Sequence, residues 1–465
     1  MKRSKHLKKL IGILTFLAIY SCENFVDIEA PDHKIISEVV YGSDETALAA
    51  MTGIYNQLAV VNFSNGWTDS ITMLAELSGD NLECIRTTNL SLMEFQENEI
   101  QPGNTRNKGI WSSAYKIIYQ TNALLEGIEN SDNISFKIKK RLEGEAKFVR
   151  AFTYFYLVNF YGEVPLLLST NYKVNALAPR EPIVNIYKEI NIDLEDATVL
   201  LESNYIDGER TYVNRFAAMA LLARVSLYQK DWQGAEYWSS QVIMQSNLYE
   251  LLLDPNKVFL KNSREAIWQI SPLGKGSSYT FEGYTLIPHS FIPALTVFKL
   301  TDGLIQSFSG DDKRLANWVE YHSGLNIHYG FKYKDRDSWD NVTEYSMVLR
   351  LAEQFLIRAE ARAMLDNFSE ALSDIDQIRI RAGLDMIEPL GTITSKDELL
   401  DIIIKERRKE LFTEWGHRWL DLKRMDKATE TLKIDNSTWD ETDILFPIPE
   451  EERMKNPNLD QNIGY

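Results

Sequence analysis

The chain has 465 residues, of which 44% are hydrophobic and 11% aromatic, and its formal net charge is −17. This length accommodates two or three average domains, or one large helical domain with insertions. A strongly acidic chain without a basic block repels the phosphates of nucleic acids, so nucleic acid is excluded as the expected partner. The ten Trp and 22 Tyr residues suit ligand recognition, because each ring combines a broad apolar face with a polar edge.

The first 21 residues have the composition of a secretory signal. Five basic residues precede an apolar run that ends at Tyr20 and is too short to remain as a bilayer-spanning anchor. The following Ser21-Cys22 pair resembles the junction at which a lipoprotein signal is cleaved before a lipidated cysteine. We predict a lipoprotein signal peptide at residues 1–21 and a lipidated N-terminus and tether at residues 22–40. Plain secretion with a free Cys22 is the alternative.

Helical periodicity dominates residues 41–250, where apolar residues recur every three or four positions. The predicted helices cover residues 46–58, 71–77, 111–125, 139–162 and 182–201, followed by a hairpin at 213–245. The helix that ends at Gly162 is apolar on most of its faces and is predicted to lie at the centre of the core. Between the first two helices, Asn65-Gly66 marks a turn in the loop that carries Trp67.

Two helical hairpins share one pattern at an offset of 136 residues. In residues 345–383, small alanines and large apolar residues recur at helical spacing on either side of Asp366-Asn367, and residues 213–245 match them. Repeat units of this type bury their apolar faces against one another. We therefore predict a mainly α fold, in which a tetratricopeptide-like helical-repeat scaffold (an α/α superhelix) carries a large irregular, loop-rich ligand-binding insertion. Two ordinary hairpins that agree by chance are the alternative, and they also give a helical protein.

Helical periodicity is absent from residues 255–345. Thirteen aromatic residues lie within the 67 residues from Tyr279 to Tyr345, and a long irregular segment on a rigid scaffold is typical of a binding surface. After the second hairpin we predict a charged helix with a break at Gly416. Its cluster of charges at residues 405–410 is predicted to be a solvated face, stabilised by opposite charges on neighbouring turns.

No catalytic signature is present in the sequence. None of the histidines lies in an HExxH motif or at ligand spacing from a cysteine, and the chain has no GxSxG elbow, phosphate-binding loop or dinucleotide fingerprint. We predict no catalytic residue, no metal site and no cofactor. Two carboxylates such as Asp80 and Asp302 would suffice for glycoside hydrolysis, but such pairs are expected by chance among 67 acidic residues. Cys84 is predicted to be a small buried residue.

Several blocks of the chain resemble the SusD/RagB family of outer-membrane nutrient-binding lipoproteins. The resemblance covers nearly the whole mature chain in the family's order. The blocks include WSSAYKIIYQTNALLEGI, GEAKFVRAFTYFYLVNFYGEVPLL, IKERRKELFTEWGHRWLDLKRM and PIPEEERMKNPNLDQNIGY. It implies a single domain at residues 41–465, with an N-terminal part at about 41–250 and a C-terminal part at about 255–465.

The resemblance also implies a function and a partner. A protein of this family is expected to be lipid-anchored in the outer membrane, to face the cell exterior and to capture a glycan without catalysis. It is expected to deliver that glycan to a SusC-like TonB-dependent transporter. Peptide binding, as in RagB-like relatives, and a secreted helical glycosidase are the alternatives. The sequence does not name the ligand.

The residues predicted to bind the ligand lie in the segments that have no helical period. Sugar rings present C–H faces that pack on flat aromatic surfaces, while their hydroxyl groups require polar partners. The predicted aromatic contacts are Trp67, Tyr279, Tyr284, Trp318 and Trp339. The predicted polar contacts are Asp69, Asn81 and Arg336. In contrast, Trp111, Trp232 and Trp268 lie in periodic or strand-like apolar settings and are predicted to belong to the core.

Overall fold

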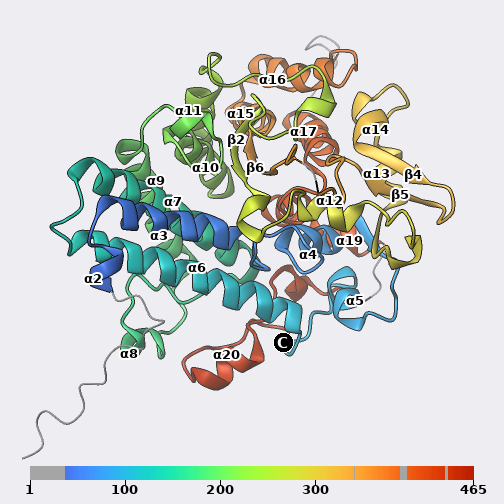
Figure 1. The fold of residues 1–465 in the computed structure, drawn as a ribbon. Coiled ribbons are helices and arrows are strands. Elements are labelled where there is room, and N and C mark those ends of the chain that lie inside the picture. The colour runs from blue at the N-terminus through green and yellow to red at the C-terminus, as the bar shows by residue number, and fades with distance from the viewer. Residues whose placement is uncertain (1–36, 340, 388–394, 435–437) are drawn as a thin grey trace, which may run out of the picture.

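The structure is a computed structural model, and it describes residues 37–339, 341–387, 395–434 and 438–465 (Figure 1). The predicted signal peptide, Cys22 and most of the predicted tether lie outside the described residues. Helices make up most of the regular structure, so the prediction of a mainly α fold is confirmed. Of the helices in the described residues, none is both long enough and apolar enough to cross a bilayer.

The regular structure of the N-terminal half is almost entirely helical. They are α2 (Ser37–Val40), α3 (Asp44–Leu58), α4 (Ile71–Ser78), α5 (Leu90–Gln96), α6 (Thr105–Glu129), α7 (Phe136–Tyr161), α8 (Tyr172–Asn175), α9 (Ile183–Leu200), α10 (Arg215–Tyr228) and α11 (Trp232–Ile243). The C-terminal half contains shorter helices before a second group of long ones. They are α12 (Phe281–Leu286), α13 (Asp302–Ser307), α14 (Lys313–Trp318), α15 (Leu351–Met364), α16 (Phe368–Arg381), α17 (Lys396–Leu411), α18 (His417–Arg424), α19 (Ala428–Leu432) and α20 (Glu450–Lys455).

The strands form three antiparallel pairs rather than one sheet. The pairs are β1 (Leu82–Cys84) with β3 (Phe298–Leu300), β2 (Ala266–Ile270) with β6 (Ser346–Arg350), and β4 (Val319–His322) with β5 (Ile327–Gly330). Short 3₁₀ turns connect the elements at Ile206–Gly208, Pro255–Lys257, Pro272–Lys275, Pro293–Leu295 and Glu441–Ile444. The segment predicted to be irregular is therefore built from short helices, short strands and turns.

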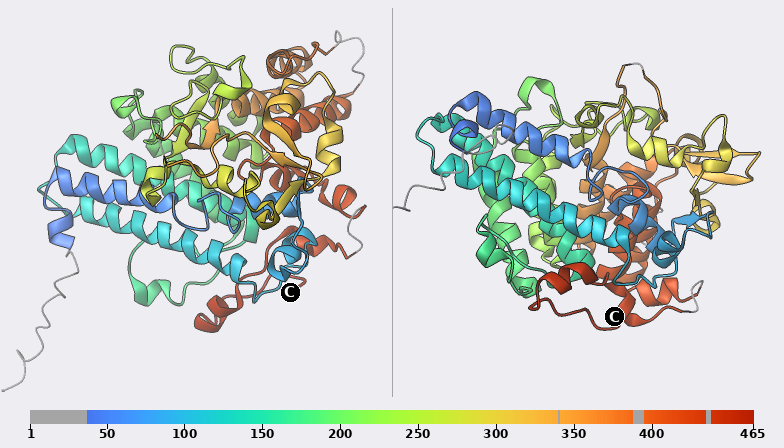
Figure 2. Two further views of the ribbon diagram at one scale, coloured as in Figure 1. Left: turned by 45° about the vertical axis from the view of Figure 1, so that its right-hand side comes forward. Right: turned by 60° about the horizontal axis from the view of Figure 1, so that its bottom comes forward.

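Helix α7 is the centre of the N-terminal core, as predicted. Nearly all side chains in its C-terminal half are buried, because α6 and α9 pack on it and α3 contacts it as well. The helix ends where Gly162 adopts a φ of +72°, a left-handed conformation that glycine reaches without strain. Figure 2 shows α3, α6 and α7 running side by side. Trp111 and Trp268 are buried in this core, while Trp232 is half-buried at its edge.

The two predicted hairpins form and pack on each other. Helices α10 and α11 make the first hairpin, α15 and α16 make the second, and α11 contacts α15. The turns are equivalent, since Lys230 and Asp366 stand 136 residues apart and have φ values of +60° and +63°. One boundary is corrected: residues Ser346–Arg350 are strand β6, because all five are buried and the strand pairs with β2. That the whole scaffold is a tetratricopeptide superhelix stays a prediction.

The charged cluster on α17 is buried, which corrects the prediction of a solvated face. Glu406, Arg407 and Glu410 are almost fully buried, and only Lys405 in this stretch is exposed. Buried charges require partners. Glu410 accepts hydrogen bonds from Arg350 at 2.5 Å and from Arg314 at 3.0 Å, and also from Arg381. We call Glu265, Arg314, Arg350, Arg381 and Glu410 the buried ion cluster.

Candidate ligand-binding site

The loop between α3 and α4 holds Trp67 in a fixed turn. The Asn65 side chain donates to the carbonyl of Val60 at 3.1 Å, and its Oδ1 accepts from the backbone N–H of Trp67 at 2.8 Å. Gly66, between them, has a φ of +77°. The Trp67 carbonyl then accepts from Ser70, which is the N-cap of α4. This turn leaves Trp67 41% exposed while Ser64, Asn65 and Gly66 before it are buried.

Helix α12 and the residue before its N-cap supply three further aromatic rings beside Trp67: Phe281 and Tyr284 lie on the helix, and Tyr279 precedes it. The helix begins after Thr280, whose Oγ1 accepts from the backbone N–H of Gly283 at 3.2 Å. The Trp67 ring centroid lies 4.3 Å from that of Phe281 and 5.5 Å from that of Tyr284, and Tyr279 stacks on Tyr284 at 5.5 Å. We call these four residues the aromatic cluster.

Arg336 adds a charged group to the aromatic cluster. Its guanidinium carbon lies 4.4 Å from the centroid of the Tyr284 ring, which is a cation–π distance. Its Nε donates to the carbonyl of Ile287 at 3.0 Å, and the guanidinium also pairs with Asp337. Arg336 is therefore held against α12. The loop that carries Trp67 and the segment that carries Arg336, both predicted to bind ligand, thus meet beside this helix although they are far apart in sequence.

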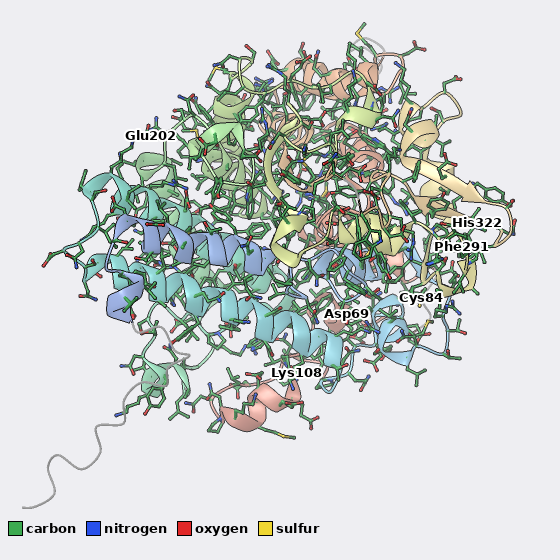
Figure 3. The ribbon with its side chains drawn as sticks, viewed as in Figure 1. Asp69, Cys84, Lys108, Glu202, Phe291 and His322 are labelled. Carbon is green, nitrogen blue, oxygen red and sulfur yellow. The ribbon has the colours of Figure 1, made fainter. Side chains whose placement is uncertain are left out.

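The predicted polar residue Asp69 stands beside the aromatic cluster and already has a partner. Its carboxylate pairs with Arg106, at the N-terminal end of α6. Figure 3 shows Asp69 below α12 in this view. The Asp69 side chain is 36% exposed, so it borders solvent next to Trp67. Its role as a ligand contact stays a prediction.

Trp339 flanks the aromatic cluster rather than joining it. Its side chain is 91% exposed. The preceding carbonyl, that of Ser338, accepts from the Ser278 hydroxyl at 2.6 Å, and Ser278 is adjacent to Tyr279. This contact brings the Trp339 backbone to the edge of the cluster.

Two of the predicted ligand residues are buried, which corrects their assignment. The Trp318 ring is completely buried, because Lys332 Nζ lies 4.8 Å and Arg381 Cζ 5.1 Å from its centroid and its Nε1 donates to the carbonyl of Pro255. Asn81 is also fully buried. Its amide donates to Glu76 at 2.8 Å and accepts from Arg408 at 2.9 Å. Neither side chain has a free surface for a ligand, so both are left out of the site.

Phe281 is a member of the aromatic cluster that the sequence analysis missed. The signal was present in the spacing, since Phe281 and Tyr284 are three residues apart and share a face once α12 forms.

Burial raises the pKa of Tyr279, with the Tyr284 ring adding to the effect. Its phenol therefore stays neutral at physiological pH and can donate a hydrogen bond to a ligand oxygen.

A separate groove of about 590 Å³ contains the carboxylates considered for glycoside hydrolysis. Asp80 and Asp302 both line it. However, Asp80 accepts from Arg418 at 2.7 Å and from Arg408 at 3.1 Å, so both of its oxygens already bind protein groups. Burial lowers the pKa of Arg408 to about 10, yet the guanidinium remains charged at neutral pH. This arrangement is that of an ion-paired carboxylate rather than a free acid or nucleophile.

Metal binding has no structural support within the described residues. No group of three or more His, Cys, Asp or Glu side chains there is arranged to hold a metal ion. Cys84 is buried and has no disulfide partner among them, as the sequence analysis expected.

Models of two protein families match the chain, one in its N-terminal part and one from residue 301 to the end, which includes the second half of the insertion. A model described as "Starch-binding associating with outer membrane" matches residues 29–227, and a model described as "SusD family" matches residues 301–465.

Individual relatives match over nearly the full length. SusD-like protein P38 of Formosa agariphila is 25% identical over 527 residues, which include 100% of both chains. A solved SusD superfamily protein from Bacteroides vulgatus ATCC 8482 has a TM-score of 0.80 at 20% identity and covers 91% of this chain and 100% of its own. A solved structure named as a laminarin binding SusD-like protein has a TM-score of 0.77 at 22% identity, again over 91% and 100%. At these identities the solved structures show a shared fold.

Proposed function

We propose, because the chain belongs to the SusD family, that it is a cell-surface lipoprotein which binds a glycan and passes it to a transporter without catalysis. The description of the N-terminal family model associates this family with starch binding and with the outer membrane. A relative in fold is named for binding laminarin. These names support a glycan as the ligand class.

The observation that carries the proposal is the aromatic cluster. Trp67 and Tyr284 come from segments more than 200 residues apart, yet their ring centroids lie 5.5 Å apart at a partly exposed surface. Rings held in this way offer apolar faces to sugar C–H groups, and Arg336 offers donors to sugar hydroxyls. A burial role alone does not explain why the largest of these rings is 41% exposed.

The proposal is tested by titrating the purified mature protein with laminarin oligosaccharides and with maltooligosaccharides in a calorimeter. We expect saturable binding to at least one glycan on a wider glycan array, and no release of reducing sugar. Binding to peptides alone on a matched peptide array would favour the RagB-like alternative. Release of reducing sugar would favour the glycosidase alternative and would contradict a purely binding role.

The proposed partner is a SusC-like TonB-dependent transporter. The family resemblance supports this proposal, and so does a physical argument: a protein that only captures a glycan at the surface does not move it across a membrane. Affinity purification from the native host in mild detergent is expected to recover a large outer-membrane barrel in near-equal amount. Recovery of this protein alone would contradict the partnership.

Lipid anchoring at Cys22 is the remaining part of the proposal. The basic head, the short apolar run and the Ser21-Cys22 junction support it. In a host strain that lacks the transporter, Cys22→Ala is expected to release the protein from the membrane fraction. Removing the transporter excludes retention through that partner. Sedimentation of the variant with the outer membrane to the wild-type extent would then contradict lipidation.

A further inference from the structure

Three segments that are far apart in sequence lie together. They are the turn that carries Trp67, helix α12 with Tyr284, and the loop that carries Arg336. Glycine occupies the close contacts between these segments, at Gly66 against the Glu282 side chain and at Gly283 against the Asp335 carbonyl.

Gly66 allows the Trp67 turn to close on the Glu282 side chain. A Cβ atom at Gly66 would overlap the carboxyl group of Glu282, well within the 3.0 Å that real Cβ atoms keep from other atoms. Glu282 cannot readily move away, because it is 3% exposed and accepts a hydrogen bond from Ser346. Ser346 lies on β6, which pairs with β2. The Trp67 turn therefore rests on a buried carboxyl that is tied to a strand pair.

Gly283 allows a second close contact, between α12 and the loop that carries Arg336. A Cβ atom there would overlap the carbonyl oxygen of Asp335. The Asp335 backbone is fixed in place, because Glu344 accepts from the N–H groups of Lys334 at 2.7 Å and Asp335 at 3.2 Å. The next residue is Arg336, which donates to the carbonyl of Ile287 after the end of α12. The distance between Arg336 and Tyr284 thus depends on how closely this loop approaches the helix.

We propose that Gly66 and Gly283 are positioning residues that set the spacing of the ligand site, with Glu282 as the buried support against which the Trp67 turn closes. This inference rests on the proposed function, since it assumes that the aromatic cluster holds the glycan. Neither glycine touches the ligand. Each acts by letting an aromatic or charged side chain reach its place beside α12.

Each test variant has a control that shares its backbone but lacks the close contact. Gly66→Ala is compared with Gly208→Ala, because Gly208 has a φ of +73° and nothing within 4 Å of its Cβ position. Gly283→Ala is compared with Gly53→Ala, a helical position that also has nothing within 4 Å. Both variants of the first pair then carry the strain of an alanine in the left-handed conformation. Both variants of the second pair carry an alanine in a helix, so only the close contact differs within each pair.

The primary measurement is affinity for the laminarin or maltooligosaccharide probe that the wild type binds, with the melting temperature recorded for every variant. Gly66→Ala and Gly283→Ala are expected to remain folded and to bind about tenfold more weakly or worse, which is the scale of losing one good contact. The control variants are expected to bind like the wild type. Unchanged affinity in both folded test variants would overturn the inference.

A second measurement does not require any ligand. Hydrogen exchange of backbone amides in residues 64–69 and 335–338 is expected to accelerate in the test variants and not in the controls. If the wild type binds neither probe and no other glycan on the array, the proposed glycan class fails while hydrogen exchange still decides the inference. Unchanged exchange in both segments would then overturn it.

A rescue variant separates positioning from general damage. Glu282→Ala removes the atoms that an alanine at position 66 would meet, so the double variant Gly66→Ala with Glu282→Ala is expected to bind more tightly than Gly66→Ala alone. Should Gly66→Ala fail to fold, Gly283→Ala and Glu282→Ala carry the same affinity and exchange measurements. A double variant no better than Gly66→Ala would count against overlap with Glu282 as the cause of the loss.

Discussion

Tyr284 and Trp318 in the insertion both have cations over their rings, but Trp318 is enclosed and Tyr284 belongs to an accessible cluster. Tyr284 has Arg336 4.4 Å from its centroid and belongs to a cluster whose Trp67 is 41% exposed. Trp318 has Lys332 at 4.8 Å and Arg381 at 5.1 Å, and it is completely buried. The same kind of interaction, a cation over an aromatic ring, occurs in both places. What differs is the supply of buried carboxylates, which lets cations be enclosed around Trp318.

The buried ion cluster is what encloses Trp318, so breaking it is expected to have the largest effect. Arg350→Ala leaves Glu410 and Glu265 buried with one cation fewer, and the loss of one partner from a buried ion pair costs about 3–5 kcal/mol. Denaturant unfolding should report a destabilisation of that order. The matched control is Lys405→Ala, an exposed position on α17, which should stay within about 0.5 kcal/mol of the wild type. A similar small change for both would mean that the cluster is not structural.

Removing the buried ring itself is expected to be nearly as damaging. Trp318→Ala leaves a large cavity between Lys332, Arg381 and the 255–257 turn, and such truncations cost about 3–5 kcal/mol. The free energy of unfolding measures the loss. If the variant instead melts like the wild type and loses glycan binding, the original assignment of Trp318 to the ligand site was correct and the comparison above is wrong.

The long periodic elements were predictable because their own residues determine them. Helix α7 and the two hairpins carry their apolar faces in their local sequence, and even the turns at Lys230 and Asp366 repeat. The burial of Glu410 was not predictable in this way. Its partners Arg314, Arg350 and Arg381 come from 29 to 96 residues earlier in the chain. The sequence of α17 by itself shows only alternating charges and does not reveal these partners.

The candidate site was predictable in part for the same reason. Trp67, Tyr279 and Tyr284 were selected by the lack of helical period, and the structure places them together. The same rule also selected Trp318, because short irregular segments do not reveal which ring faces inward. Gly66 and Gly283 gave no sequence signal for close contact with α12, since a glycine in a turn or helix has many explanations.

The pH dependence of stability separates two kinds of buried glutamate. Burial raises the pKa of Glu76 from 4.5 to about 7. Burial also acts to raise the pKa of Glu410, but the three neighbouring arginines outweigh it and hold that pKa well below its usual value. Between pH 4.5 and 7 the unfolded chain has released the Glu76 proton while the folded protein still holds it. Glu76 therefore destabilises the fold increasingly as the pH rises through this window.

Glu76→Gln is expected to remove this penalty. Relative to the wild type, the variant should gain stability as the pH rises from 4.5 to 7, by up to about 3 kcal/mol. Melting temperatures at matched pH values give the difference, and the glutamine oxygen can still accept from the Asn81 amide. A difference that stays constant across the window would show that Glu76 does not titrate there. Glu410 acts in the opposite sense, since its contribution is lost as the pH falls through and below 4.5.

The smallest effect on stability is expected at Trp67, and it should appear in binding instead. Trp67→Ala removes a ring that is 41% exposed, so the backbone turn held by Asn65 survives and the melting temperature should change little. Loss of one stacking contact corresponds to about 1.4 kcal/mol, or roughly tenfold in affinity. Trp67→Phe keeps a smaller aromatic face and should lose less. Tyr172→Ala on α8, an exposed aromatic outside the aromatic cluster, serves as the control and should bind normally. Calorimetric titration measures the affinity of the variant. A folded Trp67→Ala variant with wild-type affinity would leave the aromatic cluster without a role in binding. An unfolded variant would show that Trp67, like Trp318, is required for the fold.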